Sequence, residues 1–327
     1  MKPILHAAIL CALFSSTTSF AQSPVTDAPD LLRASDATAL PGDLKEDANA
    51  AARLRVQILL DRLQFGPGEI DGRWGSNTER AIAAFQRSRN LEASGTIDAA
   101  TWQALNADTA PVLVEYRLTA QDIAGPYNAL PDDMMAKAAL PQLGFTSLGE
   151  ALGERFHASP ALLQALNPGA DFSREGTALW VPNVQVAVPA KAASVVVDRS
   201  DASVILRDEQ GRAYARYPAS IGSEHDPLPI GRWTIKGVAR DPHFQYNPRL
   251  FWDADPGHSK AKLAPGPNNP VGVVWVDLSK DHYGIHGTPE PGKVGKTESH
   301  GCIRLTNWDA AALAGAVAPG TPAVLQE

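Results

Sequence analysis

Two residues near the end of the sequence have side chains that could carry out nucleophilic chemistry. Cys302 is one of two cysteines in the chain, and His286 precedes it by sixteen positions, at the end of a short apolar run. The thiolate is the reactive form of cysteine, so an imidazole that accepts the thiol proton would generate it. The pair therefore predicts covalent catalysis by Cys302, provided that two strand ends bring the side chains together.

Gly301 immediately precedes the cysteine and has its own expected role. Because it has no side chain, an acyl substrate can approach the backbone closely, and backbone N–H groups near a nucleophile can hold an oxyanion. We therefore expect Gly301 to act through its backbone.

The residues around this pair resemble the active-site signature of the L,D-transpeptidases, the YkuD-type catalytic domain. The matching residues are His286, Gly287 and Thr288, followed by Ser299, His300, Gly301, Cys302, Ile303, Arg304 and Leu305. The resemblance implies that Cys302 is the acylated nucleophile and His286 its general base and acid. It also implies that the backbone carbonyl of Gly287 orients the histidine ring.

The remaining signature residues have weaker assignments. By resemblance, His300 and Arg304 shape the site and bind the substrate, and Ser299 is grouped with them. Arg304 could equally be a structural ion-pair partner, and Ser299 could be a turn residue.

Three other interpretations compete with a cysteine acyltransferase. A lone cysteine is often a small buried hydrophobe. His282, His286, His300 and Cys302 could be imagined as zinc ligands, but they lack the HExxH spacing of metallopeptidases. A wall-binding protein without activity is the third interpretation. We expect no metal and no organic cofactor.

The elements that must position the pair are predicted to be strands. Alternating or continuous apolar runs separated by turn residues begin at about Ser194 and favour a mostly β sandwich or barrel over residues 194–327. The expected strands cover residues 195–197, 204–206, 213–221, 229–235, 273–278, 283–286 and 322–325. Residues 240–269 form a loop expected to cover the active site, and Asn307 is expected to cap a closing helix.

A three-helix unit is predicted over residues 51–107. Ser76 and Glu79 have the spacing of a capping box for its second helix, and Asp98 can cap the third. The unit resembles the peptidoglycan-binding domain of the first type, through residues that include Gln57, Asp71 and Trp74. Most of these would build turns and core, and any glycan binding would lie beside Asp71 and Trp74.

The middle of the chain, residues 114–183, resembles the second half of a LysM repeat, a small glycan-binding helix pair with flanking strands. A long insertion over residues 119–146 interrupts it, and a helical spacer is the alternative. Residues 184–193 are a predicted linker. The whole chain is thus predicted to be a multidomain α+β protein.

The start of the chain predicts export. Residues 1–21 have the basic start, apolar run and small residues of a signal peptide, with an apolar run too short for a transmembrane span. Residues 22–50 are predicted to be a flexible leader. The net charge of −7 disfavours nucleic acid as a partner. The expected location is the periplasm, in association with the cell wall.

The resemblance implies a peptidoglycan L,D-transpeptidase. Its donor would be a tetrapeptide stem that loses its terminal D-alanine, and stem peptides and glycan would be its partners. The acceptor stays open: a diaminopimelate amine, a lysine of an outer-membrane protein, a D-amino acid, or water, which would make the enzyme a carboxypeptidase.

Overall fold

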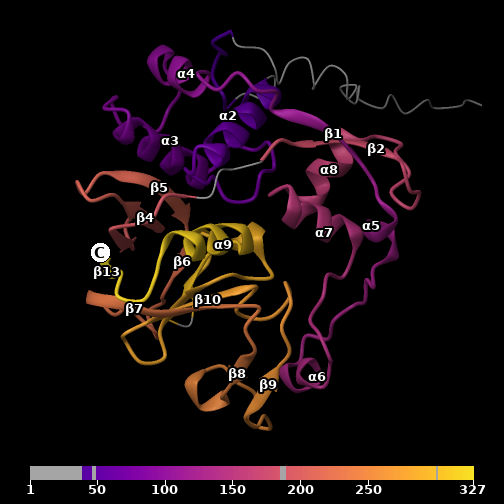
Figure 1. Ribbon diagram of the computed structural model, residues 1–327, viewed down its shortest axis with the longest axis vertical. Helices are drawn as coiled ribbons and strands as arrows, with labels where there is room; N and C mark the ends of the chain where they lie inside the picture. The colour runs from indigo at the N-terminus through magenta and orange to yellow at the C-terminus, as the bar shows by residue number, and fades with distance from the viewer. Residues whose placement is uncertain (1–38, 46–48, 185–188, 300) are drawn as a thin grey trace, which may run out of the picture.

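The computed structural model describes residues 39–45, 49–184, 189–299 and 301–327. The predicted signal peptide, most of the predicted leader, part of the linker and His300 lie outside these residues. In Figure 1 the first helices lie at the top, a small α/β segment at the right and a large sheet below them.

Three helices follow one another as the sequence predicted: α2 (Ala50–Arg62), α3 (Ser76–Ser88) and α4 (Ala99–Leu105). Asp98 caps α4 by accepting a hydrogen bond from the amide of Thr101, as expected. The predicted capping box on α3 is wrong. The N-cap is Gly75, without a side-chain cap, and the indole of Trp74 donates to the Glu79 carboxylate instead.

Residues 39–45, within the predicted leader, are among those that the structure describes. Leu44 is buried in the hydrophobic core that these helices share with the next segment, and Arg53 donates to its carbonyl oxygen at 3.1 Å. The turn beside which glycan binding was predicted is braced by Gln57, and glycan binding there stays a prediction. Gln57 donates to the Asp71 carboxylate at 3.1 Å and accepts from the Gly72 amide at 2.8 Å.

The middle segment has the order strand, helix, helix, strand, interrupted by an insertion. Strand β1 (Leu113–Arg117) pairs antiparallel with β2 (Ala178–Pro182), and α7 (Leu148–Arg155) and α8 (Pro160–Leu166) lie between them in sequence. The insertion holds α5 (Ala120–Ala124) and α6 (Met134–Ala138). This order fits the LysM-like prediction, which stays a prediction.

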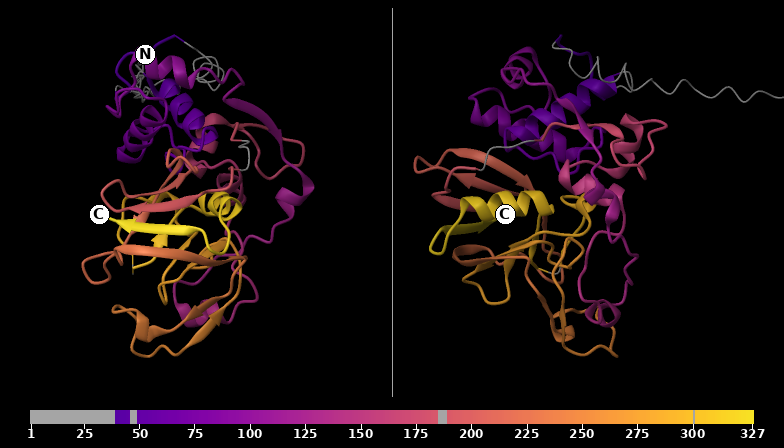
Figure 2. Two further views of the ribbon diagram at one scale, coloured as in Figure 1. Left: turned by 60° about the vertical axis from the view of Figure 1, so that its left-hand side comes forward. Right: turned by 45° about the vertical axis from the view of Figure 1, so that its right-hand side comes forward.

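The insertion extends to the far end of the molecule, where α6 lies beside a small hairpin (Figures 1 and 2). The hairpin consists of β8 (Phe244–Tyr246) and β9 (Ala261–Leu263). Leu143 of the insertion is buried with Tyr246 and Leu263 in a separate hydrophobic cluster. The loop predicted over residues 240–269 therefore contains a hairpin that another segment holds in place.

A nine-stranded sheet forms the C-terminal part, in the order β5-β4-β3-β13-β7-β10-β11-β12-β6. Its two edge strands, β5 and β6, are separated by the single residue Ala219, so the sheet curls like a barrel. This confirms the predicted mostly β unit. Its strands are β3 (Ser194–Asp198), β4 (Ser203–Arg207), β5 (Ala213–Pro218), β6 (Ser220–Ile221), β7 (Gly231–Arg240), β10 (Val274–Leu278), β11 (Gly284–His286), β12 (Ile303–Arg304) and β13 (Pro322–Gln326).

Short helical segments complete the sheet region: two 3₁₀ turns, Pro248–Leu250 and Pro291–Lys293, and α9 (Asn307–Ala316). The predicted cap of α9 is wrong by one residue. Thr306 is the N-cap, and its hydroxyl accepts from the amide of Asp309 at 3.2 Å.

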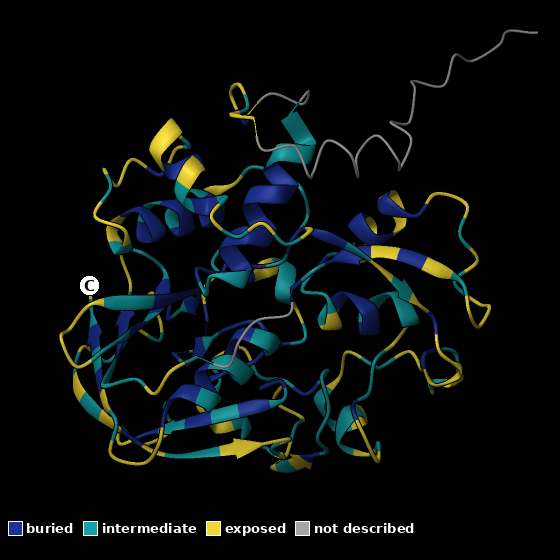
Figure 3. Ribbon diagram, turned by 45° about the horizontal axis from the view of Figure 1, so that its top comes forward, coloured by how far each residue is buried: buried dark blue, intermediate teal, exposed yellow. Residues whose placement is uncertain are grey.

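The N-terminal unit contacts the sheet region through backbone and side-chain hydrogen bonds. The amide of Gly66 donates to the carbonyl of Arg216 at 2.8 Å, and the amide of Arg216 donates to the carbonyl of Gln64 at 2.8 Å. Asn77 donates to the carbonyl of Val294 at 2.8 Å. Figure 3 shows buried residues continuing through the helices and the sheet, so the helical unit is packed onto the sheet.

Candidate active site

The sheet places His286 at the end of β11 and Cys302 directly before the neighbouring strand β12. Strands β11 and β12 are parallel, with Ile285 opposite Ile303 and His286 opposite Arg304. Side chains alternate between the two faces of a strand, so His286 and Arg304 share a face. Cys302 lies two residues before Arg304, in the bend that leads into β12. Strand pairing thus places His286 beside β12, the strand that directly follows Cys302; the catalytic pairing of the two side chains stays a prediction.

His286 is buried and held on two sides. Its Nδ1 lies 2.7 Å from the carbonyl oxygen of Gly287, which can only accept, so Nδ1 carries the proton and Nε2 has a free lone pair. The indole ring of Trp275 stacks on the imidazole, with ring centroids 5.4 Å apart and an interplanar angle of 15°. Burial lowers the pKa of His286 to about 4, and the charge of Arg304 contributes. The ring is therefore neutral near pH 7.

Cys302 is half-buried, and its thiol donates to the carbonyl oxygen of His282 at 3.7 Å. Burial raises the pKa of the thiol, and the negative charge of Asp226 adds to the rise. The backbone N–H of Gly284 and the charge of Arg304 oppose it. Desolvation penalises the charged form of the thiol, and a neutral imidazole does not compensate for it.

The loop before Cys302 requires a glycine at position 301. Gly301 has a φ of 94°, which side chains rarely adopt, and a Cβ atom there would lie 3.2 Å from the ring of Tyr283. The glycine thus lets the chain turn tightly beside Tyr283 and present Cys302.

The hydroxyl of Ser299 forms two hydrogen bonds with the backbone around the same loop. Its hydroxyl donates to the carbonyl of Cys302 at 2.5 Å and accepts from the amide of Gly222 at 2.7 Å. These bonds favour the turn role over substrate binding. Arg304 is partly exposed and close enough to alter the pKa of both Cys302 and His286. His300 lies outside the described residues, so its assignment stays a prediction.

Two residues at the site were not predicted from the sequence. Trp275 is the register partner of His286 on β10, a relationship that the sequence could have indicated only if the strand register were known. Asn307 was assigned to a helix cap, but its Oδ1 accepts from the amide of Val273 at 3.1 Å. A Cβ atom on Gly287 would lie 2.2 Å from that Oδ1, so Asn307 packs directly against the turn that orients His286.

Within the described ranges, no group of three or more His, Cys, Asp and Glu residues is placed to hold a metal ion. None of the helices in those ranges combines the length and apolar character needed to cross a membrane.

Comparison with known families agrees with the two sequence resemblances. A family model described as "L,D-transpeptidase catalytic domain" matches residues 192–325. A second, described as "Putative peptidoglycan binding domain", matches residues 49–105.

Curated proteins give the same result. "Putative L,D-transpeptidase YkuD" of Bacillus licheniformis is 32% identical over 165 residues, which cover 49% of this chain and 82% of that protein. The protein of the same name from Bacillus subtilis is 53% identical over 55 residues, covering 17% and 34%. "Probable L,D-transpeptidase YbiS" of Escherichia coli K12 is 27% identical over 149 residues, covering 44% and 48%. The chain thus spans less than half the length of the last two.

Solved structures of the same class resemble the chain more distantly. A structure of L,D-transpeptidase 3 from Mycobacterium tuberculosis, in complex with a faropenem-derived adduct, is 21% identical with a TM-score of 0.34 and covers 48% of this chain and 77% of that one. An L,D-transpeptidase from Xylanimonas cellulosilytica is 16% identical with a TM-score of 0.35, covering 84% and 92%. The sequence matches are the stronger finding.

Proposed function

This chain belongs to the L,D-transpeptidase family, and on that premise we propose that it transfers an acyl group from a peptidoglycan stem peptide to an amine. Cys302 is the nucleophile in this proposal, and His286 is the general base and acid. The observation that carries the proposal is the arrangement of His286. Its buried neutral ring has the Nδ1 proton fixed on the Gly287 carbonyl, and it ends the strand that pairs with β12, which directly follows Cys302.

The first half-reaction acylates the cysteine. Nε2 of His286 accepts the thiol proton while the sulfur attacks the carbonyl carbon of the third stem residue. A C–S bond forms, the amide C–N bond breaks, and the departing D-alanine amine takes the proton from the imidazolium. The product is a thioester on Cys302.

The second half-reaction releases the stem. An acceptor amine attacks the thioester carbon, and a C–N bond forms as the C–S bond breaks. His286 takes the amine proton and returns it to the departing thiolate, which restores the thiol. A neutral thiol and a neutral imidazole suit this sequence, because the proton moves only when the attack occurs. The low pKa of His286 makes the imidazolium a strong acid, which favours protonation of the leaving amine.

The other parts of the chain complete the proposal. The N-terminal helices, which match a peptidoglycan-binding family, would hold the enzyme on the polymer and raise the local concentration of stems. The predicted signal peptide would place the protein in the periplasm. Four acceptors stay open: a diaminopimelate amine of a neighbouring stem, a lysine of an outer-membrane protein, a D-amino acid and water.

Mass spectrometry of muropeptides tests the proposal. Purified protein lacking residues 1–21 would be incubated with disaccharide-tetrapeptides, alone and with a D-amino acid or a lysine peptide. We expect release of D-alanine, a new cross-linked dimer, and a stem adduct on the peptide that contains Cys302. The product identifies the acceptor.

Cys302→Ser is the matched control, since it changes one atom and weakens the nucleophile. Turnover of this variant above a few per cent of wild type would contradict the assignment of Cys302. If wild-type protein shows neither adduct nor product but is retained on sacculi, the protein is a wall-binding protein without activity.

A further inference from the structure

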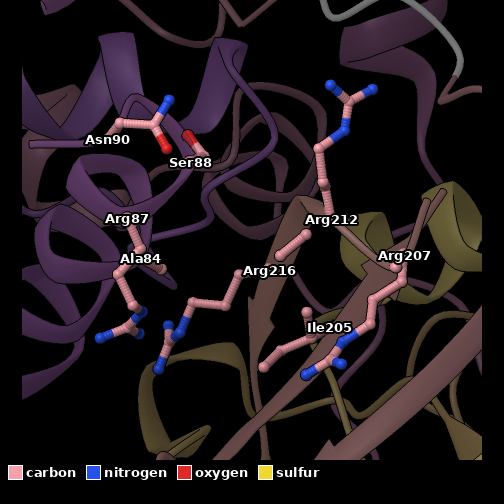
Figure 4. Close-up of a pocket in the computed structure, with 10 residues that line it drawn as sticks. Ala84, Arg87, Ser88, Asn90, Ile205, Arg207, Arg212 and Arg216 are labelled. Atoms are coloured by element: carbon pink, nitrogen blue, oxygen red, sulfur yellow. The ribbon is translucent and has the colours of Figure 1, made fainter.

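A cavity of about 370 Å³ lies between helix α3 and strands β4 and β5. None of the residues that line it belongs to the candidate active site. Its volume falls within the range of small-molecule sites in proteins, which is roughly 300–1,000 Å³. Figure 4 shows its side chains, which come from the helical unit on one side and the sheet on the other.

Four arginines line this cavity: Arg87, Arg207, Arg212 and Arg216. Two of them are paired with carboxylates. Arg216 is fully buried, and its Nε donates to Asp201 at 2.9 Å. Arg212 pairs with Asp208 at 2.8 Å and extends away from the other arginines in Figure 4. The cavity is thus strongly basic in a chain whose net charge is −7.

The other two arginines have no carboxylate partner among the described residues. Arg87 is exposed at the rim. Arg207 is partly buried, and its Nε is buried without a hydrogen-bond acceptor. A buried charged donor that lacks an acceptor is destabilising. A ligand that supplies an acceptor would therefore stabilise the folded protein. The charges of Arg80 and Arg87 also lower the pKa of Arg216, after the larger effect of burial, which places these cations close enough to repel one another.

The chemistry of the walls indicates the kind of anion. Guanidinium groups form two parallel hydrogen bonds with a planar carboxylate. Between the arginines, Ala84, Ile205 and Ala213 provide an apolar wall, which suits a short alkyl chain. A free inorganic ion has no apolar atoms that could pack against that wall.

We propose that this cavity is a binding site for a short acidic peptide, with one carboxylate on Arg207 and a second on Arg87. The ligand would contact α3 and the sheet together and relieve the repulsion between their arginines. The site is separate from the acyl-transfer site, and the proposal does not depend on the proposed function.

Isothermal titration calorimetry with N-acetyl-Glu-Glu-amide tests the proposal on the full mature chain. This probe is not a stem peptide, so it does not report on the acyl-transfer site. We expect saturable 1:1 binding that weakens with added salt, and a melting temperature that rises with probe concentration. The probe Gln-Gln-amide, which has no carboxylates, should not bind.

Two variants locate the site. Arg87→Gln with Arg207→Gln should weaken binding at least tenfold, since each arginine loses a charge-assisted hydrogen bond. The double variant should fold normally, because neither side chain has a hydrogen-bond or ion-pair partner to lose in the part of the chain that the structure describes. Arg232→Gln, at an exposed arginine on β7, removes one positive charge elsewhere and should leave the affinity unchanged.

Three outcomes would overturn the proposal. The first is absence of saturable binding of the diglutamate probe. The second is equal loss of affinity in the double variant and in Arg232→Gln. The third is tighter binding of inorganic phosphate than of the probe, competitive with it, which would make the cavity a phosphate site.

Discussion

Glu154 in α7 and Asn307 at the start of α9 are joined by a hydrogen bond of 3.0 Å, although 153 positions separate them in the sequence. Asn307 also accepts from the amide of Val273 and packs against Gly287, whose carbonyl holds His286. The middle segment therefore contacts a residue that supports the orientation of the proposed base. This connection makes Asn307 a positioning residue.

We expect Asn307→Ala to lower turnover about tenfold or more and to destabilise the fold by roughly 1–3 kcal/mol, because the amide of Val273 loses its acceptor. Glu154→Gln keeps an acceptor for the Asn307 side chain and should have a smaller effect on both. Steady-state kinetics and urea unfolding measure the two effects. If Asn307→Ala loses stability but keeps wild-type turnover, Asn307 supports only the fold and does not position His286.

The stability of the protein should fall as the pH rises, because of Asp309. Burial raises its pKa from the ordinary 3.8 to about 7, and its Oδ2 has no hydrogen-bond partner. The folded state keeps a proton that the unfolded chain releases above pH 4. Its contribution is therefore favourable below pH 4 and is lost as the pH rises to about 7.

Asp309→Asn removes this dependence. At pH 8 the variant should be more stable than wild type by roughly 2–4 kcal/mol, and near pH 4 the two should be about equal. Part of the wild-type slope should remain, because burial also raises the pKa of Glu154 to about 7. Urea unfolding from pH 4 to 8 measures the slope, with the exposed carboxylate change Glu209→Gln as control. Parallel curves for wild type and Asp309→Asn would show that Asp309 is not the group responsible.

On the acid side of the pH profile, kcat/KM should decline only at an unusually low pH. His286 must be neutral to accept the thiol proton, and burial lowers its pKa to about 4. We therefore expect kcat/KM to stay high down to about pH 5, where a histidine of ordinary pKa would already be protonated. An acid limit at pH 6 to 7 would contradict this assignment.

His286→Ala should show whether the imidazole acts as a general base or as a charged partner that stabilises the thiolate. Turnover should fall roughly a hundredfold or more, the usual effect of losing a general base. The pH midpoint for alkylation of Cys302 by iodoacetamide should change little, because a neutral ring does not stabilise a thiolate. A large upward shift of that midpoint in the variant would instead indicate an ion pair in the wild-type protein.

Two charges near Cys302 should move its pKa in opposite directions. Asp226 raises the pKa of the thiol and Arg304 lowers it. Asp226→Asn should therefore shift the alkylation midpoint to lower pH, and Arg304→Gln should shift it to higher pH. Iodoacetamide labelling against pH, followed by mass spectrometry, measures both. Shifts of the same sign would mean that one variant acts through a change in structure.

Much of the fold could be predicted from the sequence, because it depends on local patterns. The strands around His286 and Cys302 follow from short apolar runs between turn residues, and the three helices follow from periodic apolar residues and stop signals. The side chain of Asp98 caps α4 as predicted, since a cap depends on residues three positions apart. The signature also indicated the two candidate catalytic residues, of which His286 ends β11 and Cys302 directly precedes β12.

Tertiary structure decided the features that depend on burial and on distant contacts. The sequence placed a basic and a nucleophilic group together, but desolvation determines that both are neutral. Asn307 was available to cap α9, yet Thr306 does so and the Asn307 side chain contacts Glu154, a residue from another segment. The arginines of the cavity are unremarkable in sequence and become a charged site only where α3 meets the sheet. Charge and pKa depend on what surrounds a group in space, and no local pattern in the sequence specifies those surroundings.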